Sequence, residues 1–224
     1  MNTAIIGLGN IGSRLTKNLA AGGEKIIVAE RTLEKADRFA KELGGNAQAM
    51  SVPDAIKKSD VVILAIYLDA IKQFVATYRD LLVGRIVVDP SNPIAPDGEG
   101  GFKKTIPANQ SSGQIVSALL PKGARFVKAF GTLSAGALAS GANRTPERAV
   151  LFYATDDGEA ARAVEKLISA SGFSPVRVGG VDQSIRIEVG GDLHEFGQLG
   201  RLVSTKEAET LIRSSCRHSY GRHH

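Results

Sequence analysis

Short apolar runs alternate with amphipathic stretches along most of this chain. Helices with one apolar face are predicted at residues 33–43, 52–57, 111–120 and 158–171. Strands are predicted where short apolar runs stand between glycine or polar residues, at 4–6, 24–29, 46–50, 60–66, 85–89, 125–129, 148–154 and 176–178. Because strands that alternate with helices are typical of a parallel sheet covered on both faces, the pattern predicts an α/β fold with a doubly wound parallel sheet.

The first predicted strand ends in the glycine-rich sequence GLGNIG at residues 7–12, which opens a helix. The first glycine allows a tight turn, the second leaves room for a diphosphate beside the backbone, and the third lets the helix pack on the strand. The free N–H groups at the start of that helix favour an anion. We therefore predict a pyrophosphate-binding turn made by Gly7, Leu8, Gly9, Asn10, Ile11 and Gly12.

Glu30, Arg31 and Thr32 follow the second predicted strand, where residues that contact the adenosine ribose are expected. A carboxylate here binds the 2′-hydroxyl of NAD, whereas a guanidinium binds the 2′-phosphate of NADP. This chain has both groups. NADP is the favoured cofactor because Arg31, Thr32 and Lys35 supply three donors against one acid, and NAD is the alternative.

Composition and charge exclude several classes of protein. The chain has 224 residues, 43% of them apolar and 23% charged, which is enough to bury a large core. No apolar run is long enough to span a membrane and no signal peptide is evident, so we expect a cytoplasmic protein without membrane contact. The single cysteine, Cys216, excludes disulfides within the chain and disfavours thiolate chemistry.

The net charge of +5 does not indicate a nucleic-acid partner. Most lysines are scattered among acids on the predicted helices, and basic residues gather only near the carboxyl end. That end lacks apolar periodicity and finishes in paired histidines. We therefore predict a disordered tail at residues 214–224 and no nucleic-acid binding.

Residues 93–113 hold three prolines and four glycines, so regular structure is not expected there. A loop of this length in a compact domain is usually functional or disordered. Because it follows a strand whose carboxyl end faces the predicted cofactor cleft, we expect it to border that cleft.

Six segments together resemble one known family more specifically than the glycines alone. They are GLGNIG (7–12), ERTLEKA (30–36), DVVILAIYLDAI (60–71), VVDPSNP (87–93), SSGQIVSALLPKGARFVKAFGT (111–132) and LFYATDDGEAARAVEKLISASGFSPVRVG (151–179). Over most of residues 1–200 the chain resembles the deazaflavin-dependent, or coenzyme F420, NADP oxidoreductases. The resemblance implies a homodimer in which each chain has a Rossmann domain at 1–130 and a small carboxyl-terminal α/β lobe at 131–213. Between the two lies a cleft where NADP meets a deazaflavin or flavin as its small-molecule hydride partner.

The resemblance also implies which residues line that cleft. The backbone and small side chains there hold two rings together for hydride transfer, so no catalytic acid, base or nucleophile is expected. The cofactor side is predicted at Ala65, Ile66, Tyr67, Asn92 and Pro93, and the partner side at Gly131, Thr132, Leu133 and Ser134.

Two positions depart from the family pattern. Glu30 stands where a small polar residue is usual before the arginine, and it would repel a 2′-phosphate. Gly131 stands where the family commonly has asparagine. These departures leave the choice of nucleotide and the identity of the hydride partner open.

The sequence also bears on other possible functions. Asp192, His194 and Glu195 are possible metal ligands, but their spacing matches no metal signature, so we expect no metal and a polar surface or dimer contact. A hydroxyacid or imine dehydrogenase usually needs a long helical carboxyl-terminal domain, for which too few residues follow the last strand. The remaining alternatives are an NAD(P)-dependent reductase of another small substrate and a non-catalytic NAD(P)-binding sensor.

Overall fold

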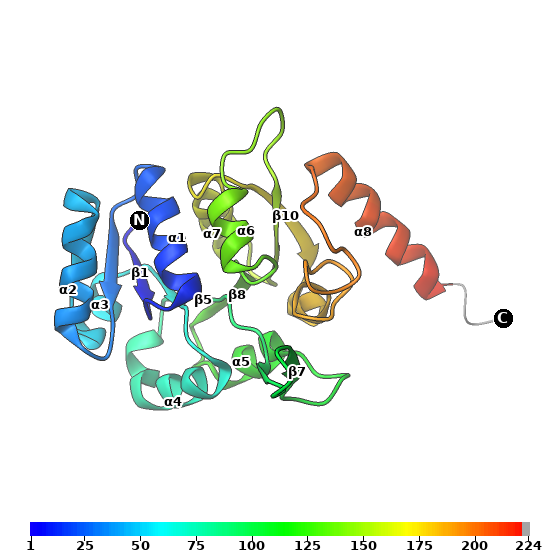
Figure 1. Ribbon diagram of the computed structural model, residues 1–224. Coiled ribbons are helices and arrows are strands. Elements are labelled where there is room, and N and C mark those ends of the chain that lie inside the picture. The colour runs from blue at the N-terminus through cyan, green and yellow to red at the C-terminus, as the bar shows by residue number, and fades with distance from the viewer. Residues whose placement is uncertain (221–224) are drawn as a thin grey trace.

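The structure, a computed structural model, describes residues 1–220, and the side chains as far as residue 213. An eight-stranded sheet runs through the molecule in the order β10-β9-β8-β5-β4-β1-β2-β3 (Figure 1). Its strands are β1 (Thr3–Ile6), β2 (Ile26–Ala29), β3 (Ala47–Ala49), β4 (Val61–Leu64), β5 (Ile86–Asp89), β8 (Arg125–Ala129), β9 (Val150–Ala154) and β10 (Ser174–Gly179). The four-residue strands β1, β2 and β4 are buried throughout, as expected of central strands covered on both faces.

All neighbouring strands are parallel except β8 and β9, which pair antiparallel. The mostly parallel, doubly wound fold confirms the predicted fold class, but this reversal was not predicted. Its cause lies in the connection between the two strands, where α6 (Ala135–Ser140) packs against α1 (Asn10–Ala21) instead of crossing the sheet. Asn18 Nδ2 donates to the carbonyl of Leu138 at 2.8 Å, and the chain enters β9 from the edge where β8 ends.

Helices cover both faces of the sheet. One face carries α1, α6, α2 (Leu33–Glu42) and α7 (Gly158–Ala170), whose apolar side chains share one core cluster with Ile5, Val28 and Ile63 of the strands. The other face carries α3 (Val52–Lys58), α4 (Leu68–Tyr78) and α5 (Ser112–Leu119) over a second cluster. The two clusters take alternate residues of the central strands β1, β2, β4 and β5, because successive side chains of a strand point to opposite faces of the sheet.

A third apolar cluster lies over β9 and β10. It contains side chains from the 3₁₀ segment η3 (Val181–Ile187) and from α8 (Thr205–Tyr220), including Ala208. In Figure 1, α8 extends away from the sheet toward the carboxyl terminus. The helix enters the segment predicted to be a disordered tail and continues through residue 220; residues 221–224 lie outside the described part of the chain.

The loop predicted at residues 93–113 contains regular structure, so the expectation of none was wrong. Strands β6 (Ile94–Pro96) and β7 (Phe102–Lys104) form an antiparallel hairpin. Asp97 Oδ1 closes its turn by accepting from the N–H groups of Glu99 and Gly101. Gly98 and Gly100 adopt positive φ there, so the glycines that indicated a loop serve the turn of a hairpin.

Strands of the predicted carboxyl-terminal lobe belong to the same sheet as those of the predicted Rossmann domain. The division at residue 130 stays a prediction. Within residues 1–220, no helix is both long and apolar enough to cross a membrane.

Candidate functional site

The glycine turn joins β1 to α1 and packs against the end of β4. Gly7 has φ +93°, and a side chain there would place its Cβ 2.6 Å from the carbonyl oxygen of Ala65. A Cβ at Gly12 would lie only 2.0 Å from the carbonyl oxygen of Gly7. Gly9 differs from both, because an added Cβ would meet nothing within 4 Å. Two glycines are therefore required by packing, and the third opens a space.

That space lies at the amino terminus of α1. The first hydrogen bond of the helix runs from the N–H of Ser13 to the carbonyl of Gly9 at 3.0 Å. Within the described residues, the preceding N–H groups of Asn10, Ile11 and Gly12 have no hydrogen-bond acceptor. Free N–H groups and the helix dipole together suit a phosphate-sized anion.

Glu30 reaches back to this turn from the end of β2. Its Oε2 accepts from the N–H of Leu8 and from Lys35 Nζ, both at 3.1 Å, and its Oε1 accepts from the N–H of Arg31. Burial raises the pKa of Glu30, but these donors outweigh it and the pKa lies below its usual value. The carboxylate is therefore charged, bound to the turn and paired with a lysine.

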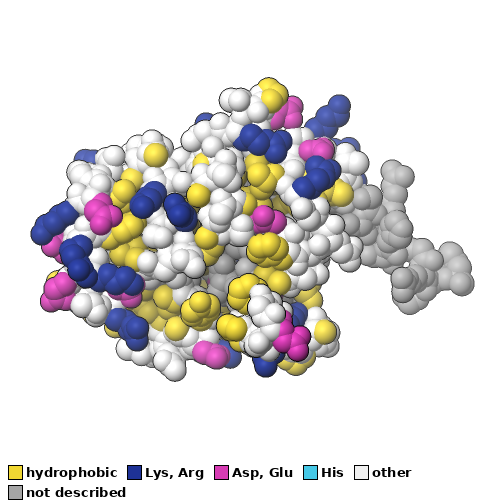
Figure 2. Space-filling model, viewed as in Figure 1, with side chains coloured by type: hydrophobic (Ala, Val, Ile, Leu, Met, Phe, Trp, Pro, Cys, Tyr) yellow, Lys and Arg dark blue, Asp and Glu magenta, His cyan; other side chains and the backbone are white. Residues whose placement is uncertain are grey.

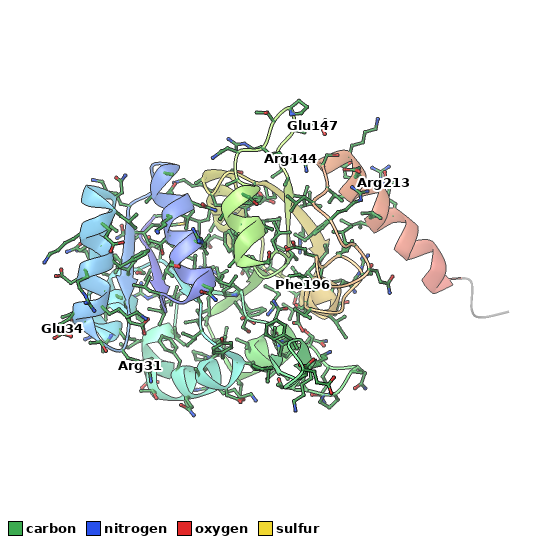
Figure 3. The ribbon with its side chains drawn as sticks, viewed as in Figure 1. Arg31, Glu34, Arg144, Glu147, Phe196 and Arg213 are labelled. Carbon is green, nitrogen blue, oxygen red and sulfur yellow. The ribbon has the colours of Figure 1, made fainter. Side chains whose placement is uncertain are left out.

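Arg31 and Thr32 lie exposed beside this carboxylate at the start of α2. Figure 3 shows Arg31 at the periphery, near the end of α2 that faces α4. No hydrogen bond or ion pair holds its guanidinium within the described residues, whereas Lys35 is engaged with Glu30. Arg31 is thus the cation at this corner with its donors available to a ligand.

The predicted residues after β4 have different roles. Ala65 forms the wall against which Gly7 and Gly12 pack, and the side chain of Ile66 also contacts the Gly7 position. Tyr67 precedes α4 and is 79% exposed, so it is not packed in a core. Its ring is available at the same edge of the sheet as the glycine turn.

Asn92 links three segments at the end of β5. Its Nδ2 donates to the carbonyl of Gly131 at 2.9 Å, and its Oδ1 accepts from the N–H of Val189 at 2.8 Å. Pro93 is buried, and its carbonyl accepts from the N–H of Thr105 beside the hairpin. The residues after β5 and β8, predicted separately, thus come together, as strands that are neighbours in the sheet require.

The segment after β8 is closely packed. A Cβ at Gly131 would lie 2.6 Å from the carbonyl oxygen of Pro90, so the asparagine common in the family does not fit here without a shift. Thr132 and Leu133 are buried, and the Thr132 hydroxyl has no hydrogen-bond partner among the described residues. Ser134 is half-buried and caps α6 by accepting from the N–H of Ala137 at 3.1 Å.

Residues 188–196 lie against the predicted residues after β8, a contact that the sequence pattern does not predict. The N–H of Glu195 donates to the carbonyl of Thr132, and its carboxylate accepts from the N–H of Ser134 at 2.6 Å. His194 Nε2 lies 2.8 Å from the carbonyl of Gly131. The only signal in the sequence was the polar cluster at 192–195, which nothing in the pattern connected to residues 131–134.

His194 is buried and forms a hydrogen bond through each of its two ring nitrogens. Its Nδ1 accepts from the N–H of Phe196 at 2.8 Å, which assigns the proton to Nε2 and makes Nε2 the donor to Gly131. Burial holds the pKa of His194 below its usual value of 6.5, so the ring is neutral. Asp192 pairs with Arg186 at 2.7 Å, and no group of three metal-ligating side chains converges within the described residues.

The surface above these residues is hollowed. Figure 2 shows a hollow near the centre of the face, between α6 and the part of the molecule that carries α4 and β7, with hydrophobic side chains on its rim. Phe196, 59% exposed, lies beside it (Figure 3).

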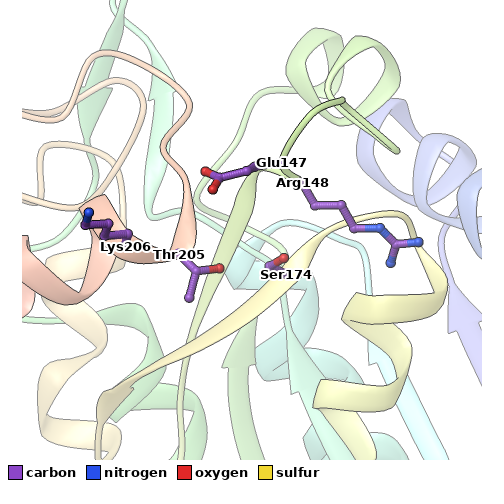
Figure 4. A pocket seen from close by; sticks show the side chains of 5 residues that line it. All are labelled: Glu147, Arg148, Ser174, Thr205 and Lys206. Carbon is purple, nitrogen blue, oxygen red and sulfur yellow. The ribbon is translucent and has the colours of Figure 1, made fainter.

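A separate pocket lies where β10 begins and is lined by Glu147, Arg148, Ser174, Thr205 and Lys206 (Figure 4). Arg148 points away from the other four and donates to the carbonyl of Ser169. None of the predicted site residues lines this pocket.

The fold and the glycine turn define this protein as a Rossmann-type α/β protein. The family model described as "NADP oxidoreductase coenzyme F420-dependent" matches residues 2–93. The chain is 28% identical over 199 residues to the F420-dependent NADP reductase of Methanothermobacter thermautotrophicus, an alignment that covers 84% of this chain and 85% of that protein. The resemblance to the coenzyme F420-dependent NADP oxidoreductase family is thereby confirmed.

Solved structures agree on the fold. The hypothetical protein SMa0349 from Sinorhizobium meliloti is 34% identical and superposes with a TM-score of 0.80, over 92% of this chain and 96% of that one. A candidate F420-dependent NADP reductase from Arthrobacter sp. FB24 superposes with a TM-score of 0.69, over 97% and 92% of the two chains. At 18% identity, this second likeness shows the fold alone.

Proposed function

We propose that this protein transfers a hydride between NADP(H) and a deazaflavin of the coenzyme F420 type. The observation that carries the proposal is the open space at Gly9, beside unpaired N–H groups at the start of α1. A diphosphate fits the chemistry of that space, because backbone donors and a helix dipole favour an anion. The family resemblance supports the second half of the proposal, the deazaflavin partner.

The nucleotide half is assigned to the turn at residues 7–12 and to the corner formed by residues 30–35. Arg31 would bind the 2′-phosphate with a charge-assisted pair of hydrogen bonds. Glu30 opposes the phosphate less than an isolated carboxylate would, because Lys35 and two N–H groups already balance its charge. NADP therefore remains the favoured nucleotide.

The nicotinamide half is assigned to the ends of β4, β5 and β8, over Ala65–Tyr67, Asn92–Pro93 and Gly131–Ser134. The bound nicotinamide supplies the hydride at its C4 atom. The protein supplies position and exclusion of water, through the Asn92–Gly131 contact and the buried backbone of residues 131–133. The exposed rings of Tyr67 and Phe196 offer apolar surface to a second planar ring.

The test is an assay of NADPH oxidation in the absence of oxygen, with acceptors added one at a time. Oxidation is monitored through the loss of the absorbance of reduced nicotinamide. Coenzyme F420, FMN, FAD and riboflavin are the acceptors to compare. We expect turnover with F420. Turnover with flavins alone would replace the deazaflavin in the proposal. Tight NADPH binding without turnover on any acceptor would favour the alternative function, a non-catalytic NAD(P)-binding sensor.

A homodimer is proposed by analogy with the family. Sedimentation velocity on the full chain tests this proposal. A single species with the mass of one chain at micromolar concentration would contradict it.

A further inference from the structure

A buried cluster of three charged side chains lies under the nicotinamide end of the proposed site. Lys128 and Glu188 are each 1% exposed, and Asp89 is fully buried. Lys128 Nζ lies 2.8 Å from Asp89 Oδ2 and 3.7 Å from Glu188 Oε1. Burying charges costs free energy even when they are paired, so such a cluster calls for a role beyond filling space.

Asp89 and Lys128 hold the backbone of Ser91 from both sides. Asp89 Oδ1 accepts from the N–H of Ser91 at 2.7 Å, and Lys128 Nζ donates to the carbonyl of Ser91 at 2.5 Å. The next residue is Asn92. The Asp89–Lys128 ion pair therefore fixes the backbone of the residue directly before Asn92.

Glu188 fixes the opposite side of Asn92. Its carboxylate accepts from the N–H groups of Ser112 and Gly113, at 3.0 and 2.8 Å, and from the hydroxyl of Ser111. These donors form the amino terminus of α5 and stabilise the negative charge. The residue after Glu188 is Val189, whose N–H donates to the Asn92 side chain.

Ser112 joins the two halves of the cluster, because its hydroxyl lies 2.9 Å from Lys128 Nζ and 3.0 Å from Glu188 Oε1. The backbone before Asn92 is thus held by Asp89 and Lys128, and its side chain is held by the segment that follows Glu188. Asn92 in turn donates to the carbonyl of Gly131, which fixes the position of that carbonyl. We propose that Lys128, Asp89 and Glu188 are positioning residues that act through Asn92 to hold the nicotinamide end of the dinucleotide site in its binding geometry.

This inference rests on the proposed function, and its test separates the two ends of the nucleotide. NADPH contacts both ends, whereas adenosine 2′,5′-bisphosphate contacts only the turn and the Arg31 corner. Dissociation constants of both are measured by titration calorimetry for the wild type, Lys128→Met, Asn92→Ala and the double variant. Lys166→Met is the matched control, because it removes an exposed lysine that pairs with Glu24.

In Lys128→Met we expect NADPH binding to weaken about tenfold and bisphosphate binding less than about twofold, since a loosened site must be reordered on binding. The double variant should weaken NADPH binding no more than about twofold beyond the stronger single variant, because both changes break one chain of contacts. Lys166→Met should match the wild type for both ligands. Asp89→Asn keeps an acceptor for the Ser91 N–H while removing the charge, and it replaces Lys128→Met if that variant does not fold.

Equal weakening for both ligands in a folded variant would make the cluster a general stabiliser and overturn the inference. Fully additive effects in the double variant would also overturn it, because Lys128 would then act independently of Asn92. A wild-type protein that binds neither ligand would overturn the proposed function and this inference together.

Discussion

At the residue scale, the three glycines of the turn have separable roles. Gly9→Val places its side chain in open space, so the fold should hold while the diphosphate position is blocked. Gly12→Ala forces a Cβ against the Gly7 carbonyl and should lower the free energy of unfolding by about 3 kcal/mol. Thermal unfolding and calorimetric titration with NADPH measure the two effects. Wild-type affinity in folded Gly9→Val would end the assignment of the diphosphate to this turn.

The choice of nucleotide is also a residue-scale question. Arg31→Ala should weaken NADP binding about ten- to a hundredfold, as the loss of about 1.5–3 kcal/mol of charge-assisted hydrogen bonding implies, and leave NAD binding nearly unchanged. Glu30→Ser should improve NADP relative to NAD, because it removes the acid and releases Lys35. The control is Arg38→Ala, which removes an exposed arginine from α2.

Paired dissociation constants for NADP and NAD decide the question. A wild type that prefers NAD tenfold, with Arg31→Ala neutral for NADP, would make Glu30 the ribose ligand.

The buried ring of His194 makes the stability of its segment depend on pH. Because its pKa is lowered in the folded protein, the unfolded chain binds a proton more readily, and stability falls as pH drops below about 6.5 toward the folded value. His194→Gln retains a side-chain donor but does not titrate, so the difference in unfolding free energy between wild type and variant should shrink over that interval.

Urea unfolding at several pH values tests this effect of His194. The comparison is cleanest after removal of residues 214–224, which contain the other three histidines of the chain. A difference between wild type and variant that is independent of pH would show that His194 does not titrate differently on folding.

At the element scale, strands and helices with clear periodicity were predicted within a few residues. The strand predicted at 60–66 is β4, and the helix predicted at 158–171 is α7. The β6–β7 hairpin was missed because prolines and glycines predict a loop when local propensity is considered alone. Helix α8 (residues 205–220) was not predicted: residues 205–213 were assigned to the carboxyl-terminal lobe without an element, and residues 214–224 were predicted to be a tail. The apolar contacts of Ala208 with residues of β9 and β10 are long-range, so no local pattern indicates them.

Removal of residues 214–224 tests the role of the end of α8. The apolar contacts of the helix include Ala208, Leu211 and Ile212, which the truncation keeps. We expect turnover to change by less than about twofold, because the truncation keeps the apolar contacts of Ala208, Leu211 and Ile212. A loss greater than tenfold in steady-state rate would place the end of the chain in the working site.

At the scale of the whole molecule, the candidate site lies where distant segments of the chain meet at one edge of the sheet. The glycine turn and Glu30–Arg31 could be proposed from the sequence because each is local and has a fixed place beside a strand. The segment 188–196 was not, because its contacts with Asn92, Gly131 and Ser134 appear only in the folded chain. The buried cluster of Asp89, Lys128 and Glu188 was not predicted either, because charged residues are mostly exposed and a sequence alone does not indicate which of them are buried.

The proposed reaction is direct hydride transfer between a nicotinamide and a deazaflavin at this site. Isotope transfer tests this reaction: NADPH carries deuterium at C4 on the transferred side, coenzyme F420 is the acceptor, and the product is analysed by mass spectrometry. We expect one deuterium bound to C5 of the reduced deazaflavin, because the hydride passes between the rings without exchange with water. Reduced deazaflavin without deuterium, or NADPH that binds but is never oxidised by F420, would contradict it.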